Sequence, residues 1–201
     1  PGAPLFLMIG RMFVILFGGM QHAATAINTL SALCSGFTIL FLFWTITHFA
    51  KRIIAKQNEE LTQSNLILIL GAGIVGALAY TFSDTFWFSA VEGEVYAMSS
   101  FLTALVFWAI LKWEDRMNSE GAHADRWIVL IAFIMGLSIG VHLLNLLTIP
   151  AIVMVYYFKK YKTTTKGTIL AFLLGCVITG FVQIGVIQFV PLFASKMDIL
   201  F

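Results

Sequence analysis

Four long stretches of this sequence contain no charged side chain, and they constrain the fold more than any other feature. Lys, Arg, Asp and Glu are absent from residues 12–50, 95–111, 127–158 and 167–195. A soluble domain has about 25% charged residues, whereas this chain is 11% charged and 60% apolar. About 20 apolar helical residues cross a bilayer core of about 30 Å. We therefore expect an integral membrane protein that crosses the bilayer several times.

Other classes of protein are disfavoured. The net charge is only +2, and no basic stretch is interleaved with aromatic residues, so we expect no nucleic-acid partner. Cys34 and Cys176 lie inside apolar runs, where cysteine is usually a small buried hydrophobe. The sequence has no glycine-rich phosphate loop, no zinc-protease motif and no nucleophile elbow. Because it starts at Pro1 without a signal peptide, we expect an upstream segment in a longer protein.

Most basic residues fall into three clusters. The clusters are Lys51, Arg52 and Lys56; Lys112, Arg116 and Arg126; and Lys159, Lys160, Lys162 and Lys166. Short loops rich in Lys and Arg stay on the cytoplasmic side of the inner membrane. All three clusters should therefore be cytoplasmic, with an even number of crossings between successive clusters.

The predicted fold class is all-α, a polytopic transmembrane bundle of about six membrane helices in a single domain over residues 1–201. The membrane helices are expected at about 23–50, 65–83, 96–111, 127–141, 144–158 and 168–189. Residues 1–20 are expected to form a helix at the outer interface, because 5–19 is short for a crossing and contains Arg11.

The stretch 127–158 allows two interpretations. As one helix it would extend about 48 Å at 1.5 Å per residue, which requires a strong tilt and places the last basic cluster outside. Two short helices that meet near the outer face agree better with the charge pattern. His142 and Asn145 would lie at that break, either lining a cavity or only capping the helix ends.

The segment 84–94 contains three carboxylates and no cation. We interpret it as an extracytoplasmic loop in which Asp84, Glu92 and Glu94 form a negative site at the membrane surface. Carboxylate oxygens could bind a divalent metal ion, with Glu92 and Glu94 as its ligands, or orient a hydroxyl group. The alternative is that these acids only solvate a turn. Arg11 could pair with a substrate phosphate or with lipid headgroups.

Three segments resemble the GT-C glycosyltransferases, the class that includes the protein O-mannosyltransferases. Residues 1–6 (PGAPLF) look like the end of that class's first outer loop. Residues 82–96 (FSDTFWFSAVEGEVY) and 140–150 (GVHLLNLLTIP) resemble a bacterial branch long filed as a domain of unknown function. That branch is related to the eukaryotic transmembrane O-mannosyltransferase that acts on plexin-type domains.

The resemblance implies a transferase that moves a sugar, for example mannose, from a polyprenyl-phosphate donor to a hydroxyl of a protein or glycan on the outer face. In that class an acidic residue of the first outer loop is the catalytic base, and an acidic motif of the next outer loop positions metal, acceptor or donor phosphate. Glu92 and Glu94 match the second motif. His142, Asn145 and Arg11 are candidate substrate-binding residues. Because the first loop is almost entirely missing, the isolated chain is expected to be inactive.

A transporter or lipid flippase is the alternative from a different class. Transporters usually place ionisable residues in mid-span or in broken helices at the bilayer midplane. Here the acids are predicted at the outer ends of helices, which favours chemistry at the membrane surface. A purely structural subunit would leave the Glu92–Glu94 pair unexplained.

Overall fold

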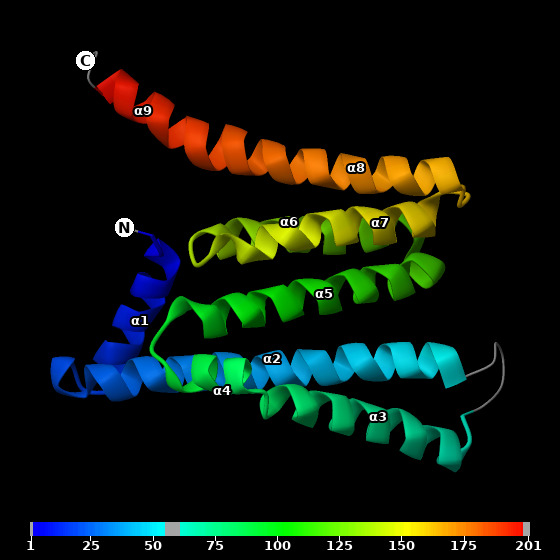
Figure 1. Cartoon of the computed structure of the whole chain (residues 1–201), viewed down its shortest axis with the longest axis horizontal. Coiled ribbons are helices and arrows are strands. Elements are labelled where there is room, and N and C mark those ends of the chain that lie inside the picture. The colour runs from blue at the N-terminus through cyan, green and yellow to red at the C-terminus, as the bar shows by residue number, and fades with distance from the viewer. Residues whose placement is uncertain (1, 55–60, 199–201) are drawn as a thin grey trace. The chain divides into compact units, whose positions relative to one another are not determined.

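A computed structural model describes residues 2–54 and 61–198 of the chain (Figure 1). Nearly all of these residues are helical, and none of them forms a strand. The predicted all-α class is therefore confirmed. The helices group into two compact units, an N-terminal unit up to Asn145 and a C-terminal unit from Leu146 onward.

The N-terminal unit is built around one long central helix. Its α-helices are α1 (Pro4–Leu16), α2 (Ala23–Ile54), α3 (Gln63–Thr81), α4 (Asp84–Val91), α5 (Val95–Glu120) and α6 (Arg126–Ile139). Helix α2 packs against α1, α3, α4 and α5, while α6 packs against α5. In Figure 1, α2, α3 and α5 run side by side and α1 crosses the end of the unit.

Glycines allow α3 to approach α2 closely. A Cβ at Gly73 would lie 2.5 Å from Thr47 Cγ2 and 2.7 Å from Phe43 Cε2, and one at Gly76 would lie 2.7 Å from Ile46 Cδ1. Gly71, in contrast, faces open space. Small residues of this kind are how membrane helices bring their backbones together.

Aromatic side chains fill the interface between α2 and α5. The ring of Phe41 lies 5.2 Å from that of Trp108 and 6.0 Å from that of Phe101, measured between centroids. Around them, Val106 and Ala109 of α5 are fully buried. Aromatic pairs at these centroid distances stabilise a core beyond the area they bury.

Helices α2 and α5 run in the same direction, so their C-terminal ends meet. Arg52 Nη1 lies 2.9 Å from a carboxylate oxygen of Glu114, and Arg52 Nη2 lies 3.5 Å from Asp115 Oδ1. The described members of the first two basic clusters lie in the C-terminal parts of α2 and α5 or at the start of α6. They are therefore at one end of this unit, which we call the basic end (Figure 1). Lys56 lies outside the described residues. Helix α3 returns to the opposite end, where α4 begins.

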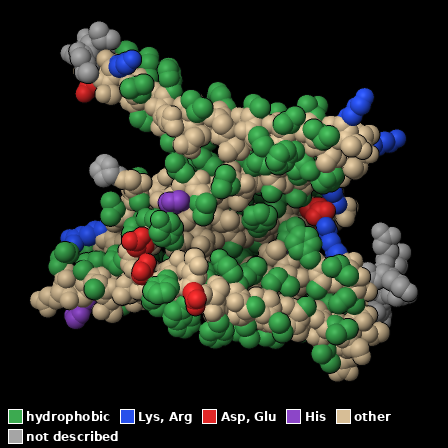
Figure 2. All heavy atoms as spheres, viewed as in Figure 1, with side chains coloured by type: hydrophobic (Ala, Val, Ile, Leu, Met, Phe, Trp, Pro, Cys, Tyr) green, Lys and Arg blue, Asp and Glu red, His purple; other side chains and the backbone are tan. Residues whose placement is uncertain are grey.

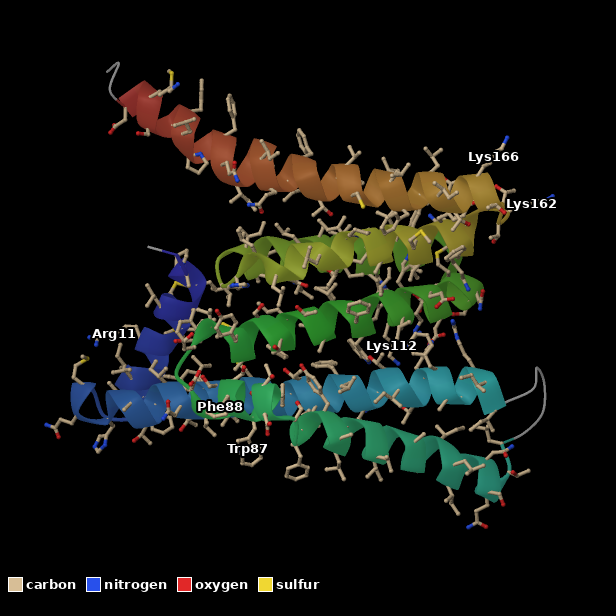
Figure 3. The ribbon with its side chains drawn as sticks, viewed as in Figure 1. Arg11, Trp87, Phe88, Lys112, Lys162 and Lys166 are labelled. Atoms are coloured by element: carbon tan, nitrogen blue, oxygen red, sulfur yellow. The ribbon has the colours of Figure 1, made fainter. Side chains whose placement is uncertain are left out.

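The segment 84–94 was expected to be a loop, and most of it is helix α4 instead. Phe86 explains the difference, because its ring is buried and lies 4.5 Å from that of Tyr80. Asp84 occupies the first turn of α4, where a negative charge favours the helix dipole. Trp87 and Phe88 are exposed, and Figure 3 shows Trp87 pointing away from the bundle.

The stretch 127–158 contains two helices, so the interpretation as a single tilted helix is wrong. Helix α6 ends at Ile139, a 3-10 segment covers Leu143–Thr148, and α7 spans Ile149–Lys160. Pro150 in the first turn of α7 explains the second boundary, because proline fits the start of a helix and not its interior.

Five segments in the described ranges are long and apolar enough to cross a membrane. They are Met20–Ile54, Gln63–Thr81, Val95–Glu120, Leu143–Lys160 and Thr165–Asp198. The number differs from the expected six because α6 has only 14 residues, or about 21 Å at 1.5 Å per residue. The exposed surface of these five segments is largely apolar, as Figure 2 shows, which supports a multi-pass membrane protein.

The C-terminal unit consists of α7, α8 (Thr165–Phe181), a π-helical segment (Val182–Phe189) and α9 (Val190–Asp198). Helix α7 packs against α8. A Cβ at Gly175 would lie 2.6 Å from Pro150 Cα, so the two backbones are in close contact. The third basic cluster surrounds the turn between these helices, where the side chain of Thr164 accepts a hydrogen bond from Gly167 N and caps α8.

Candidate functional site

The turn between α4 and α5 holds the two acids of the Glu-Gly-Glu sequence. Glu92 is the residue that follows α4, and Glu94 precedes α5 with an extended backbone and no side-chain hydrogen bond to the helix. Both side chains are exposed. Figure 2 shows acidic side chains gathered over α4 and the start of α5. The positive end of the α5 dipole stabilises a carboxylate in this position.

Gly93 fixes this turn against α2. A Cβ at Gly93 would lie 2.9 Å from Ile27 Cγ2 and 3.2 Å from Asn28 Oδ1, so only a residue without a side chain fits without displacement. The two flanking carboxylates are thus held by a backbone that contacts α2 directly.

Helix α1 is joined to the end of α6 by a backbone hydrogen bond. Leu5 N donates to Gly140 O with a distance of 2.8 Å. The first N–H groups and last C=O groups of helices lack partners within their own helix, and here one of each satisfies the other. A Cβ at Gly140 would lie only 3.0 Å from Leu5 Cβ, so glycine permits this approach.

Docking of α1 creates a pocket that contains two of the predicted site residues. The pocket has a volume of about 460 Å³ and is open to one side. Glu94 and His142 line it, together with Phe6 and Leu7 of α1 and Val141. One carboxylate and one imidazole therefore share a partly apolar concavity at the acidic end of this unit.

The ring of His142 is held by two contacts. Its centroid lies 5.4 Å from that of Tyr96, and Nδ1 accepts a hydrogen bond from Leu144 N at 3.1 Å. A nitrogen that accepts a hydrogen bond carries no proton, so the neutral imidazole has its proton on Nε2. In this arrangement His142 offers Nε2–H as a hydrogen-bond donor.

The other predicted site residues lie outside the pocket. Asp84 begins α4 on the exposed surface, and Glu92 follows α4 without lining the cavity. Arg11 projects outward from α1 (Figure 3), and its Nη1 lies 3.5 Å from Met20 Sδ. Asn145 is fully buried. Of the predicted set, only Glu94 and His142 come together.

The described residues include no cluster of side chains that could bind a metal ion through three or more ligands of their own. No group of three or more His, Cys, Asp or Glu side chains with suitable placement occurs in ranges 2–54 and 61–198. In the pocket, Glu94 supplies a carboxylate, and Nδ1 of His142 is engaged by Leu144 N. A metal ion bound by Glu92 and Glu94 stays a prediction.

Tyr96 and the apolar face of α1 are site components that sequence reasoning missed. The ring of Tyr96 packs against that of His142, and Phe6 and Leu7 line the pocket. Tyr96 was part of a distinctive segment, yet its ring contact depends on how α5 meets the break after α6. No local sequence pattern predicts this contact between α5 and the segment after α6.

A comparison with protein families identifies the family of the chain. The family described as the protein O-mannosyl-transferase TMEM260 N-terminal domain matches residues 1–165. The chain belongs to this family. The match covers all the residues that line the pocket around Glu94 and His142. It also confirms the predicted resemblance to O-mannosyltransferases. No curated protein and no solved structure matches the chain.

Proposed function

We propose that this chain forms the membrane-embedded part of a protein O-mannosyl-transferase that uses a polyprenyl-phosphate sugar donor, and that the Glu94–His142 pocket contacts the reacting groups. The observation that carries the proposal is the convergence of Glu94 and His142 in one pocket at a helix end. The family of the chain supports the class of reaction.

The two side chains supply complementary chemistry. Transfer breaks the bond between the anomeric carbon and the lipid phosphate oxygen, forms a bond to the acceptor oxygen, and releases the hydroxyl proton to a base. A carboxylate such as Glu94 can accept a hydrogen bond from the acceptor hydroxyl and orient it. The Nε2–H of His142 can donate to the departing phosphate and stabilise its charge.

The apolar wall of the pocket fits a lipid-linked donor. Phe6 and Leu7 belong to α1, a short apolar helix that crosses the end of the unit. A donor with a polyprenyl tail must leave its tail in the bilayer and present its phosphate at the interface. The pocket combines an apolar side for the first isoprene units with a polar side for the phosphate.

The charge distribution supports an outer location for the pocket. Lys51, Arg52 and Lys112 are at the basic end of the N-terminal unit, and the Glu92–Glu94 turn is at the other end. Short loops rich in Lys and Arg face the cytoplasm. On this rule the pocket opens on the extracytoplasmic face, where a protein acceptor would meet it.

The test compares two neighbouring carboxylates in the full-length protein. Glu94→Gln should reduce sugar transfer from a polyprenyl-phosphate mannose to an acceptor peptide, by roughly 10²-fold or more if the group contacts the transition state. Glu92→Gln is the matched control because it makes the same chemical change just outside the pocket. Glu92→Gln should change the rate by less than about threefold, within ordinary surface effects.

Two results would overturn this proposal. If the Glu94→Gln variant transferred sugar at the wild-type rate, the pocket would have no part in the reaction. Absence of transfer in the wild-type full-length protein, together with movement of the lipid donor across vesicle membranes, would favour the flippase alternative. The exposure of Glu94 at a helix end, away from any mid-span position, supports transferase chemistry over transport.

A further inference from the structure

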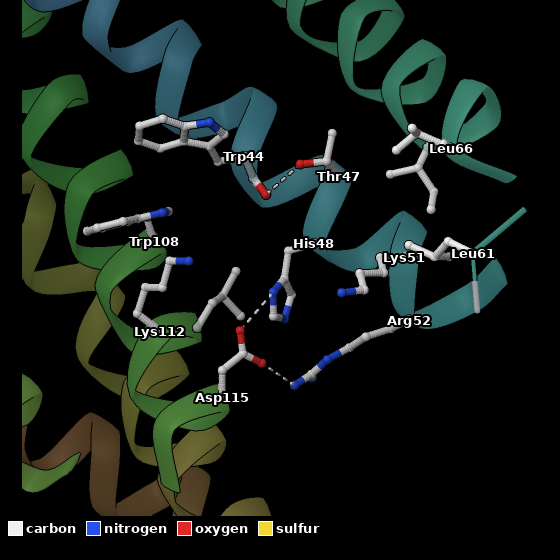
Figure 4. Close-up of a pocket in the computed structure, with 12 residues that line it drawn as sticks. Trp44, Thr47, His48, Lys51, Arg52, Leu61, Leu66, Trp108, Lys112 and Asp115 are labelled. Atoms are coloured by element: carbon white, nitrogen blue, oxygen red, sulfur yellow. Dashed lines mark hydrogen bonds and ion pairs between the residues drawn. The ribbon is translucent and has the colours of Figure 1, made fainter. Parts of the chain in front are cut away.

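A second and larger pocket lies at the basic end of the N-terminal unit, between α2, α3 and α5. Its volume is about 800 Å³ (Figure 4). Trp44 and Trp108 form an aromatic wall. The polar lining residues are Thr47, His48, Lys51 and Arg52 of α2 and Lys112 and Asp115 of α5. None of these residues has a role in the function proposed above.

Two lysines enter this pocket from different helices. Figure 4 shows Lys51 and Lys112 approaching His48 from opposite sides. In the described part of the chain, neither lysine forms an ion pair. Lys112 Nζ lies 5.6 Å from the centre of the Trp108 ring, a cation–π distance that holds the ammonium group at the wall.

The acidic groups nearby are already engaged. Arg52 binds Glu114 at 2.9 Å and Asp115 at 3.5 Å, and the other oxygen of Asp115 lies 3.5 Å from His48 Nδ1. Both carboxylates therefore have a partner other than the two lysines. The pocket thus presents two ammonium groups to an incoming ligand.

The remaining lining is apolar and lies at a helix end. Leu66 and Ile69 of α3 and Leu111 of α5 line the pocket beside the indoles, whose ring centroids are 5.8 Å apart. Helices α2, α3 and α5 belong to three of the candidate membrane segments. Trp and Lys side chains at such ends are typical of the headgroup level of a bilayer.

We propose that this pocket binds the headgroup of an anionic phospholipid. The phosphate lies between Lys51 and Lys112, and the glycerol and first acyl carbons lie against Trp44, Trp108 and Leu66. Basic pockets between membrane helices on the cytoplasmic side bind anionic lipid headgroups. The site is independent of the Glu94–His142 pocket, since the two are at opposite ends of the same unit.

The experiment measures lipid binding to the full-length protein in detergent by native mass spectrometry. Phosphatidylglycerol should bind more tightly than phosphatidylcholine, because each lysine near an anionic headgroup favours it by about fivefold. The Lys51→Gln/Lys112→Gln variant should weaken phosphatidylglycerol binding by roughly 25-fold, leaving no preference between the two lipids. The matched control is Lys162→Gln/Lys166→Gln, which removes two exposed lysines that do not line the pocket (Figure 3).

A second arm separates a lipid from a free phosphate. Excess glycerol 3-phosphate should not displace phosphatidylglycerol, because it lacks the acyl carbons that contact the aromatic wall. Phosphatidylglycerol with brominated acyl chains should quench tryptophan fluorescence more in the wild type than in Trp44→Phe/Trp108→Phe. Full displacement by glycerol 3-phosphate, or an unchanged lipid preference in Lys51→Gln/Lys112→Gln, would overturn the proposal.

Folding of the variants is checked separately. Lys51 is exposed and Lys112 half-exposed, so neither substitution removes a packed core group. The double variant should keep the wild-type thermal unfolding midpoint in lipid-free detergent. A midpoint that matches the wild type, with lost phosphatidylglycerol binding, assigns the effect to the pocket.

Discussion

The N–H of Leu5 donates to the carbonyl of Gly140 at 2.8 Å, and this single bond joins the first helix of the chain to the break after α6. Two consequences follow from it. Helix α1 closes one side of the Glu94–His142 pocket, and the chain at Val141 and His142 is held where it faces Glu94. The geometry of the proposed site therefore depends on a contact between segments that are distant in sequence.

Gly140→Val should loosen this contact. The new side chain would meet Leu5, whose Cβ would already be 3.0 Å from a Cβ at position 140. Overpacking of this kind costs about 1–3 kcal/mol, and we expect a lower unfolding midpoint in detergent together with slower sugar transfer. Gly136→Val is the control, because position 136 faces open space on the same helix. Equal midpoints and rates for the two variants would show that α1 docking does not support the site.

The long helices could be predicted from the sequence because a charge-free run of membrane-spanning length leaves few alternatives. The same reasoning failed for α4, whose eight residues are too few for a clear periodicity. Helix α4 forms because Phe86 is buried against Tyr80 of α3, and this is a tertiary contact. Hydropathy also did not predict that Glu94 lines the pocket while Glu92 lies outside it.

The candidate site was predictable only in part, for a related reason. Glu94 and His142 were identified as polar groups at helix ends, but Asn145, from the same short segment as His142, is fully buried. His142 precedes the 3-10 segment Leu143–Thr148, whereas Asn145 lies inside it, so the two side chains project from differently folded backbone. Arg11 projects outward from α1, while Phe6 and Leu7 of the same helix line the pocket.

His142→Phe should separate the packing role of His142 from its chemical role. Phenylalanine can keep the ring contact with Tyr96, now at 5.4 Å, but it has no Nε2–H to donate and no acceptor for Leu144 N. We expect transfer to fall by roughly 10²-fold or more, the range for loss of a donor to developing charge, with a loss of stability near 1 kcal/mol for the backbone bond. His142→Ala should lose more stability because it also removes the ring contact. The rates and unfolding midpoints of both variants test this, and full activity of His142→Phe would exclude a donor role.

Gly73→Ala tests the close approach of α3 to α2. A methyl group there would lie 2.5 Å from Thr47 Cγ2 and 2.7 Å from Phe43, so the helices must separate or these side chains must move. We expect a destabilisation of about 1–3 kcal/mol. Gly71→Ala, two residues earlier on α3, faces open space and should be neutral or stabilising, because alanine favours helices over glycine by up to about 1 kcal/mol. The unfolding midpoints of the two variants should therefore move in opposite directions, and a shared direction would contradict the packing.

Arg52 and Glu114 link the C-terminal ends of α2 and α5, and a double-mutant cycle should measure the strength of that link. The side chains are 42% and 20% exposed, so solvent screens much of their attraction. We expect Arg52→Gln and Glu114→Gln to show a coupling energy of about 0.5 kcal/mol, as for partly exposed ion pairs. The coupling should decrease in 1 M salt, where the Debye length is about 3 Å. Arg11→Gln with Glu114→Gln is the control cycle, because α1 and the C-terminal part of α5 are at opposite ends of the unit and should not couple. A salt-insensitive coupling would mean that packing of the arginine side chain, and not its charge, joins the two helices.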